Sequence, residues 1–399
     1  MLSIKNKRTY INERGVVIIF TALFFSILTY VIQFHVDILG YMGISGLFIP
    51  DTLSMQSSIM RAVNFGIDGS YRTIIGVLYL YYPSYWLGHY YCYIVNMSML
   101  WMSVFFFLKT LQVIKLPLSK QDLSIVLFSV FFNFYIIGAF LHPNKEIPLI
   151  LLTNIFIYKL VSNSKLFSLL SIIFIVFLFR DAYAIILLAT LFFIRTRFVF
   201  SLLCRNPLVI FIVIVVFISF FDLKYISSLG VLREYNYILE RNSDISVGES
   251  SLVSLIPSQL RYFVKVWNNL FGSALRPQPL DLNGRLNFIG LGLWQFGVLL
   301  FFGSISLFGI LCRKSNFDYL NIISIAFFIC ALFVSFGSLT QARYLMPYMF
   351  WLSMGTIHFF RKDILIILFF ILLICVFFMY VLGFGMTVPL GIDIYHIDR

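Results

Sequence analysis

The chain has 399 residues, of which 61% are hydrophobic and only 12% are charged, and its formal net charge is +12. A water-soluble domain carries about 25% charged residues, so this composition excludes an ordinary soluble protein. Apolar runs of nearly twenty residues recur along the chain, which predicts an all-α, polytopic integral membrane helical bundle. The first apolar run has no small-residue cleavage site after it, so we expect a retained anchor and no cleaved signal peptide.

Taken in chain order, the apolar runs predict about eleven transmembrane helices. Basic residues near the ends of spans gather on the cytoplasmic side, and this rule places the N-terminus inside. The predicted spans are 16–35, 90–108, 122–141, 147–163, 166–180, 182–196, 207–221, 288–312, 319–338, 344–360 and 364–386. The inner side then holds 16 of the 29 Lys and Arg residues and 4 of the 17 Asp and Glu residues, which accounts for the whole net charge. The basic pI therefore indicates membrane orientation and gives no support to nucleic-acid binding.

We expect one transmembrane domain over residues 1–399, with two long outer segments. Residues 36–89 are predicted to form interfacial or re-entrant helices, and residues 222–287 to form a large, polar outer loop. The five cysteines are scattered without a CxxC motif, and the chain has only five histidines. A disulfide framework, a metal centre or another bound cofactor is therefore not expected.

Three short outer turns carry charge at or near membrane depth. Ionisable groups at that depth are costly, and they usually face the interior of a bundle or a water-filled cavity. Their positive members also oppose the orientation rule applied above. The residues are His142, Lys145 and Glu146 in LHPNKEIPLILL, Arg180 and Asp181 in the next outer turn, and Arg343 in LTQARYLMPY.

Two interpretations of these turns remain open. In the first, Lys145–Glu146 and Arg180–Asp181 are local pairs whose side chains extend towards the lipid headgroups. In the second, Lys145, Arg180 and Arg343 line a shared outward-facing pocket, with His142 beside it. Cationic groups in a poorly hydrated pocket would suit a diphosphate, because they bind phosphate oxygens strongly.

A carboxylate near the same pocket could deprotonate an acceptor hydroxyl. Asp51, in GLFIPDTLSMQ just beyond the first predicted span, is one candidate general base. Glu146 and Asp181 are its rivals. The alternative for Asp51 is a helix N-cap, because it precedes a plausible helix.

Other residues of the outer segments have two interpretations as well. Arg261, Arg276 and Arg285 in the large loop are candidate contacts for an anionic ligand, although a solvated loop surface is the preferred interpretation of each. Trp86, Trp267 and Tyr344 are predicted to be interfacial anchors, with stacking on sugar faces as the alternative.

In its size, its Phe-rich spans, its large outer loop and its outer arginines, the chain resembles the bacterial Wzy-type polymerases. These membrane enzymes join undecaprenyl-diphosphate-linked oligosaccharide units into O-antigen or capsular polysaccharide. The resemblance implies location in the inner membrane, a lipid-linked substrate and, as a partner, a chain-length regulator. It also implies that Arg180, Arg276 and Arg343 handle the lipid diphosphate.

The layout around Asp51 also resembles the polyprenyl-phosphate-dependent glycosyltransferases of the GT-C fold. Those enzymes begin with one span, followed by an outer loop with an acidic residue and interfacial helices. This chain lacks a paired acidic motif after its first span, which sets it apart from that group. A third class, a flippase for the same lipid-linked oligosaccharide, is disfavoured because the predicted span interiors are almost free of charge.

Overall fold

The structure is a computed structural model that describes residues 44–45, 50–66, 75–116, 118–140, 142–196, 264–272, 274, 286–312, 318–337 and 342–360. The predicted spans at 16–35, 207–221 and 364–386 lie outside the described residues, as does most of the predicted loop 222–287. The described part is helical, apart from a two-residue parallel pairing of β1 (Ile44–Ser45) with β2 (Leu286–Asn287).

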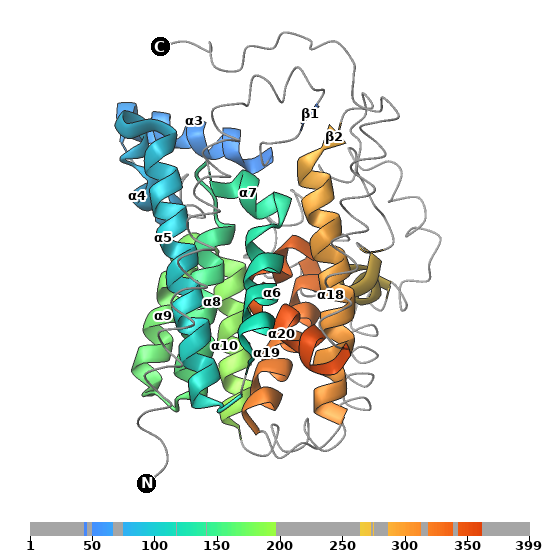
Figure 1. Ribbon diagram of the computed structural model, residues 1–399. Helices are drawn as coiled ribbons and strands as arrows, with labels where there is room; N and C mark the ends of the chain where they lie inside the picture. Colours follow the sequence, from blue (N-terminus) through green and yellow to red (C-terminus); the bar gives the residue numbers. More distant parts are fainter. Residues whose placement is uncertain are drawn as a thin grey trace, which may run out of the picture.

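The helices form a bundle whose upper end is covered by shorter helices (Figure 1). α3 (Pro50–Phe65) and α4 (Ile75–Tyr81) lie at that upper end, and η2 (Asn268–Gly272) and η3 (Ala342–Tyr348) are short helices packed within or beside the bundle. The bundle helices are α5 (Ser84–Val113), α6 (Lys120–Phe131), α7 (Phe134–Phe140), α8 (Glu146–Val161), α9 (Leu166–Phe179), α10 (Asp181–Arg195), α18 (Phe288–Cys312), α19 (Asp318–Gly337) and α20 (Met349–Phe360). The predicted spans 147–163, 166–180, 182–196, 288–312 and 319–338 coincide with α8, α9, α10, α18 and α19 to within two residues. The predicted span 90–108 lies inside the longer α5, and 344–360 is divided between η3 and α20.

Two described helices, Tyr90–Val113 and Gly290–Cys312, are long and apolar enough to cross a membrane. The α6–α7 pair adds a third if its two halves, which meet at 64°, are counted as one span. On their outer surface, α5 and α9 expose large apolar side chains such as Ile94, Phe105, Phe167 and Phe174. Such a surface is stable in lipid and not in water, so the chain is a membrane protein.

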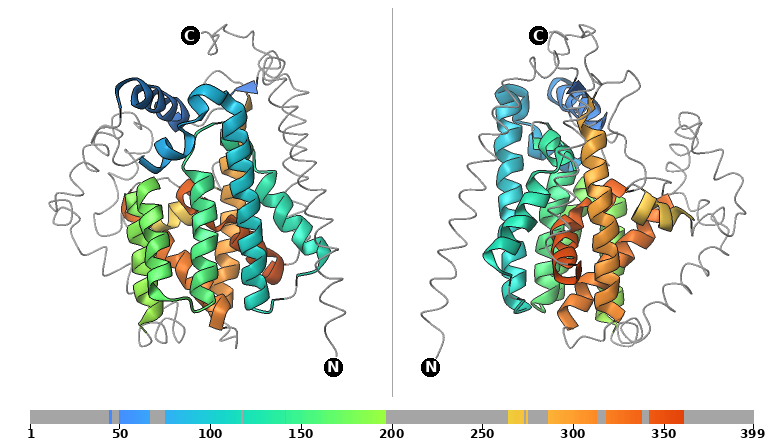
Figure 2. Two further views of the ribbon diagram at one scale, coloured as in Figure 1. Left: turned by 90° about the vertical axis from the view of Figure 1, so that its left-hand side faces the viewer. Right: turned by 45° about the vertical axis from the view of Figure 1, so that its right-hand side comes forward.

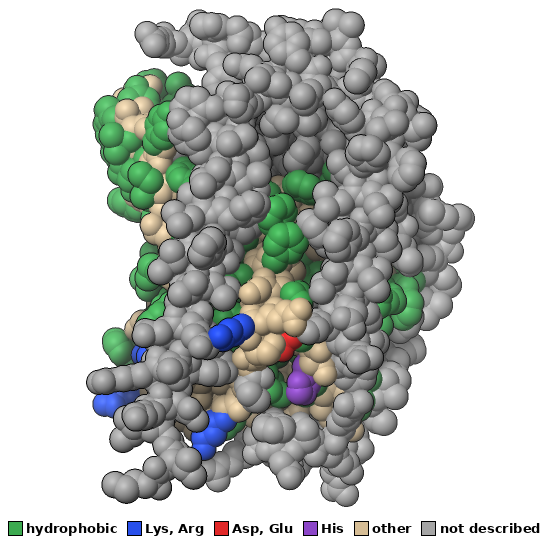
Figure 3. Space-filling model, viewed as in Figure 1, with side chains coloured by type: hydrophobic (Ala, Val, Ile, Leu, Met, Phe, Trp, Pro, Cys, Tyr) green, Lys and Arg blue, Asp and Glu red, His purple; other side chains and the backbone are tan. Residues whose placement is uncertain are grey.

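Bundle helices that follow one another along the chain alternate in direction (Figures 1 and 2). α5, α8, α10, α18 and α20 descend in the orientation of Figure 1, while α6, α9 and α19 ascend. The basic residues Lys109, Lys120, Lys159, Lys165 and Arg195 therefore lie towards the lower end. The space-filling view agrees, since its Lys and Arg side chains lie over the lower part of the molecule (Figure 3).

The predicted single span 122–141 is instead broken into α6 and α7, which corrects that prediction. Asn133 occupies the break, where its Oδ1 accepts the N–H of Tyr135 at 3.0 Å and its Nδ2 donates to the Gly292 carbonyl at 2.8 Å. Gln295 of α18 accepts the N–H of Phe134 at 3.0 Å. These side chains supply the partners that the broken helix lacks, which is the condition for such a break at membrane depth.

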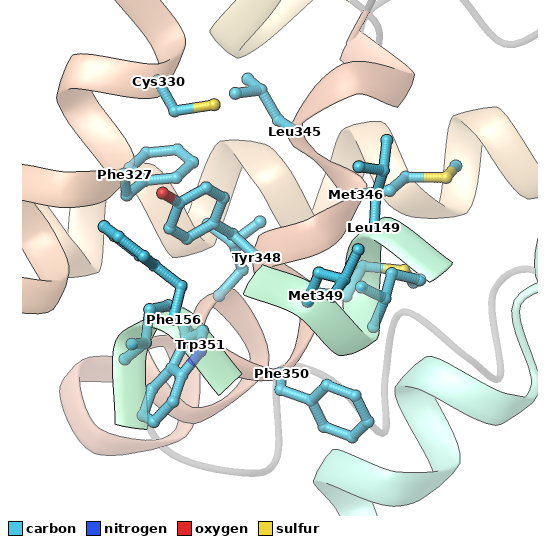
Figure 4. Packing of buried hydrophobic residues seen from close by; sticks show 14 of the residues in the cluster. Leu149, Phe156, Phe327, Cys330, Leu345, Met346, Tyr348, Met349, Phe350 and Trp351 are labelled. Atoms are coloured by element: carbon cyan, nitrogen blue, oxygen red, sulfur yellow. The ribbon is translucent and has the colours of Figure 1, made fainter. Parts of the chain in front are cut away.

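The core of the lower bundle forms where η3 and α20 pack among α8, α18 and α19 (Figure 4). Tyr348 and Trp351 are fully buried there. The Tyr348 hydroxyl donates to the Ala326 carbonyl at 3.2 Å, and the Trp351 indole donates to Asn154 Oδ1 at 3.1 Å. Both aromatic groups thus satisfy their polar atoms inside the apolar core, which holds η3 in a defined position.

Candidate functional site

The first corner comprises residues 142–146 and joins α7 to α8. Its backbone is held by Asn96 of α5, whose Nδ2 donates to the carbonyls of Ala139, Phe140 and His142 at 3.0–3.1 Å. Asn144 adds a second clamp, with its Nδ2 on the His142 carbonyl and its Oδ1 on the N–H of Ile147. The corner is therefore a rigid, buried turn whose carbonyls are directed inward.

Tyr81 of α4 completes this clamp. Its hydroxyl donates to Asn96 Oδ1, so α4 is tied to α5 and, through Asn96, to the first corner. Burial raises the pKa of the Tyr81 hydroxyl well above its usual value. The group therefore stays protonated and remains a donor.

Glu146 is buried, with 5% of its surface exposed, and its carboxylate is engaged at the start of α8. Oε2 accepts the backbone N–H of Lys145 at 3.1 Å, and Oε1 accepts the Tyr135 hydroxyl at 3.3 Å. An acidic side chain in the first turn also interacts favourably with the helix dipole. Each oxygen of the Glu146 carboxylate thus accepts one hydrogen bond within or beside the turn.

The second corner comprises Arg180 and Asp181, between α9 and α10. Arg180 is the single extended residue between the two helices; its N–H donates to the Val176 carbonyl at 2.8 Å and its carbonyl accepts from Ala184 at 3.2 Å. Asp181 Oδ1 accepts the N–H of Ala182 at 2.7 Å. Asp181 thus supports the start of α10, while Arg180 projects its side chain from a fixed backbone.

The side chain of Arg180 meets η3, which comes from the other end of the sequence. Its guanidinium carbon lies 3.5 Å from the centroid of the Tyr344 ring, and that of Arg343 lies 5.4 Å from the same centroid. The two guanidinium carbons are therefore no further apart than the sum of these distances. Arg180 and Arg343, two of the residues predicted to share a pocket, thus lie close to the same Tyr344 ring.

The second corner lies deeper in the bundle than the first. The hydroxyls of Thr153 on α8 and Tyr183 on α10 are 3.1 Å apart, which aligns the two descending helices. Glu146 is two turns above Thr153, whereas Asp181 is less than one turn above Tyr183. At 1.5 Å per residue, the second corner is about 7 Å deeper along the helix axis.

The short lengths of α9 and α10 create this depth. With 14 and 15 residues, they extend about 21 and 23 Å, less than the roughly 30 Å of a hydrocarbon core. α4 covers the end of α9, and Gly76 allows the contact, because a side chain there would meet the Leu178 carbonyl oxygen at 2.9 Å. Gly76 of α4 contacts α9, and Tyr81 of α4 bonds Asn96 of α5. α4 therefore connects the two corners over about 8 Å of helix.

The other predicted site residues are Asp51, Arg276 and Lys145, and the structure describes them less fully. Asp51 lies in the first turn of α3, at the same end of the bundle as α4, and its side chain lies outside the described part. Arg276 also lies outside the described residues. Lys145 immediately precedes α8 in the first corner and is partly exposed. Within the described residues, no three His, Cys, Asp or Glu side chains are grouped as metal ligands.

Two features of the site escaped the sequence predictions. Asn96 was not singled out, although a lone Asn within the apolar run of residues 90–108 is a signal of buried hydrogen bonding. Tyr344 was expected to be an interfacial anchor, but it is partly buried against Arg180. Trp86 and Trp267 are more than half exposed, in keeping with interfacial anchoring.

No protein-family model, curated protein or solved structure matches the chain.

Proposed function

We propose that this protein polymerises undecaprenyl-diphosphate-linked oligosaccharide repeat units into O-antigen or capsular polysaccharide. The observation that carries the proposal is the meeting of Arg180 and Arg343 at Tyr344, at a depth set by two short helices. Guanidinium groups bind phosphate oxygens through parallel N–H donors, and a poorly hydrated site strengthens that attraction. A diphosphate at the end of a lipid tail is the ligand class that reaches such a depth from the membrane.

The chemistry assigned to the arginines is charge stabilisation. In the transfer, the anomeric carbon of the growing chain loses its bond to the diphosphate and gains one to a hydroxyl of the incoming unit. The bonding electrons leave with the diphosphate, where Arg180 and Arg343 stabilise the added negative charge. Lys145 and His142 of the first corner, and Arg276 of the outer loop, are proposed to contact the same substrate.

The hydroxyl proton requires an acceptor, and the three candidates differ in their surroundings. Glu146 and Asp181 both accept backbone N–H groups at the starts of their helices. Asp51 lies in the first turn of α3, above the bundle end where α4 joins the two corners. We therefore assign the role of general base to Asp51.

The membrane arrangement that fits this function has about eleven spans, with the N-terminus inside and the large loop 222–287 outside. The gathering of basic residues at the lower end supports the lower end as the cytoplasmic side. Exposed Tyr79, Tyr85, Trp86 and Tyr90 near the upper end of α4 and α5 support an interface there. The site would then face the periplasm from a bacterial inner membrane, where a chain-length regulator is the expected partner.

A GT-C-type glycosyltransferase that adds one sugar from a polyprenyl-phosphate donor is the second candidate. The placement of α3 favours it, because this helix begins at Pro50, within the outer segment that follows the first predicted span, and lies across the end of the bundle. Both functions use the same lipid-linked leaving group. They differ in the product, which is a long chain in one case and a single added residue in the other.

Deletion of the gene and electrophoresis of the surface polysaccharide test the proposal. A polymerase predicts loss of the ladder with one capped unit remaining, and complementation with Arg180→Ala or Arg343→Ala should not restore the ladder. Arg195→Ala is the matched control, because Arg195 is exposed at the opposite end of the bundle and its side chain donates to the Ser164 carbonyl. An intact ladder of altered serology would instead indicate a single-sugar transferase, and complete absence of exported units would indicate a flippase.

A further inference from the structure

The contact between Arg180 and Tyr344 has the geometry of a stacked pair. A distance of 3.5 Å from the guanidinium carbon to the ring centroid is van der Waals contact, which requires the two planes to face each other. In that arrangement the N–H groups of the guanidinium point outward, parallel to the ring. The aromatic face therefore orients the donors without taking up their hydrogen bonds.

Both partners of this pair are attached to rigid backbone. Arg180 is fixed by the bonds of its N–H to Val176 and of its carbonyl to Ala184. Tyr344 belongs to η3, where the next two residues, Leu345 and Met346, are fully buried. The long arginine side chain is the more flexible part of the pair, and the contact with the ring restricts it.

The cation of the first corner differs from Arg180 in its chemistry. Lys145 has a flexible stem and an ammonium group, which is a point charge without a planar arrangement of donors. Arg343 lies further from the ring than Arg180, at 5.4 Å, beyond stacking contact. Arg180 is therefore the cation that lies in stacking contact with the Tyr344 ring.

We infer that Tyr344 is a positioning residue that holds the Arg180 guanidinium ready to bind the diphosphate of a lipid-linked substrate. The inference rests on the proposed function, because it assigns Tyr344 to the same anion site. It differs from sugar stacking, since the guanidinium occupies one face of the ring. The Tyr344 hydroxyl has no part in the stack, so the inference requires only the aromatic ring.

Binding of geranylgeranyl diphosphate to the purified full chain in detergent tests this role. Tyr344→Phe should bind within about twofold of the wild type, whereas Tyr344→Leu should bind about tenfold more weakly, as expected for a lost cation–π contact in a partly desolvated site. Tyr344→Gln, measured in parallel, also lacks the ring but has a side chain of different shape and polarity from leucine. Arg180→Lys should lose as much affinity as Tyr344→Leu, because an ammonium cannot provide the planar donors.

Tyr319→Leu is the matched control, because Tyr319 is an exposed tyrosine at the lower end of α19. Unfolding temperatures of the unliganded variants show whether a loss of affinity reflects misfolding. If the Leu and Gln variants bind like the wild type while Arg180→Ala loses binding, Tyr344 has no positioning role and the diphosphate site stands. If Arg180→Ala also binds like the wild type, both the positioning role and the diphosphate site are refuted.

Discussion

Replacement of Asn96 by alanine probes the clamp that holds the first corner. The Asn96 amide contacts three carbonyls at 3.0–3.1 Å and accepts the Tyr81 hydroxyl. Its NH₂ group has two hydrogens, so the three carbonyls share them. The amide therefore makes the equivalent of three hydrogen bonds, each contributing about 1 kcal/mol in water and less in a membrane. Asn96→Ala should lower the free energy of unfolding by roughly 2–4 kcal/mol, because it also leaves buried polar groups unsatisfied.

Equilibrium unfolding in mixed micelles titrated with dodecyl sulfate measures this change. Ser103→Ala is the control on the same helix, since the Ser103 hydroxyl donates only to the Met99 carbonyl one turn earlier among the described residues. The control should lose less than about 1 kcal/mol. Asn96→Asp should be more harmful than alanine, because it directs a carboxylate at three carbonyls. Equal stability of Asn96→Ala and Ser103→Ala would refute the clamp.

Two further predictions concern the packing of the bundle. Gly292→Ala should lower the free energy of unfolding by about 3 kcal/mol, since the new Cβ would lie 2.1 Å from the Tyr135 backbone nitrogen and the backbone must shift. An unchanged unfolding curve would contradict this contact. Ser119→Ala should cost about 1 kcal/mol, because it removes the capping box in which Ser119 Oγ accepts the Asp122 N–H at 3.1 Å. Its control is Ser124→Ala, which removes one hydroxyl bond within the same helix, and equal losses in the two variants would show that the cap contributes nothing.

Most of the described helix boundaries follow from hydropathy alone. Runs such as LFSLLSIIFIVFLF at residues 166–179 contain no charge, and a lipid-embedded backbone must satisfy its own hydrogen bonds within the helix. The predicted span 166–180 therefore differs from α9 by one residue. The charged turns were predictable for the same reason, since they are the places where the apolar runs stop.

The bend between α6 and α7 was not predictable from that local pattern. Its stability depends on Gln295, a residue of α18 that bonds the N–H of Phe134 across the bundle. Asn133 is a polar residue within the predicted span 122–141, but it does not identify a partner so distant in the sequence. Only the placement of α18 against the break decides that the helix bends.

The candidate site was also predictable only in part. Arg180 and Arg343 were identifiable as charges in short turns between apolar runs, each from its own turn. Their meeting at Tyr344 depends on how η3 packs against the bundle, which the sequence of either turn does not specify. Similarly, the bonds of the Glu146 carboxylate to the Lys145 N–H and the Tyr135 hydroxyl could not be predicted from the sequence of its own turn.

The central claim is that the two arginines serve the joining of lipid-linked oligosaccharides. The most direct measurement reconstitutes the purified protein in vesicles with undecaprenyl-diphosphate-linked repeat units and follows chain length and released undecaprenyl diphosphate. The account predicts chains of many repeat units, one diphosphate lipid released for each joining step, and loss of both products in Arg180→Ala but not in Arg195→Ala. Repeat units that remain single with the wild-type protein, or equal elongation by Arg180→Ala, would contradict it.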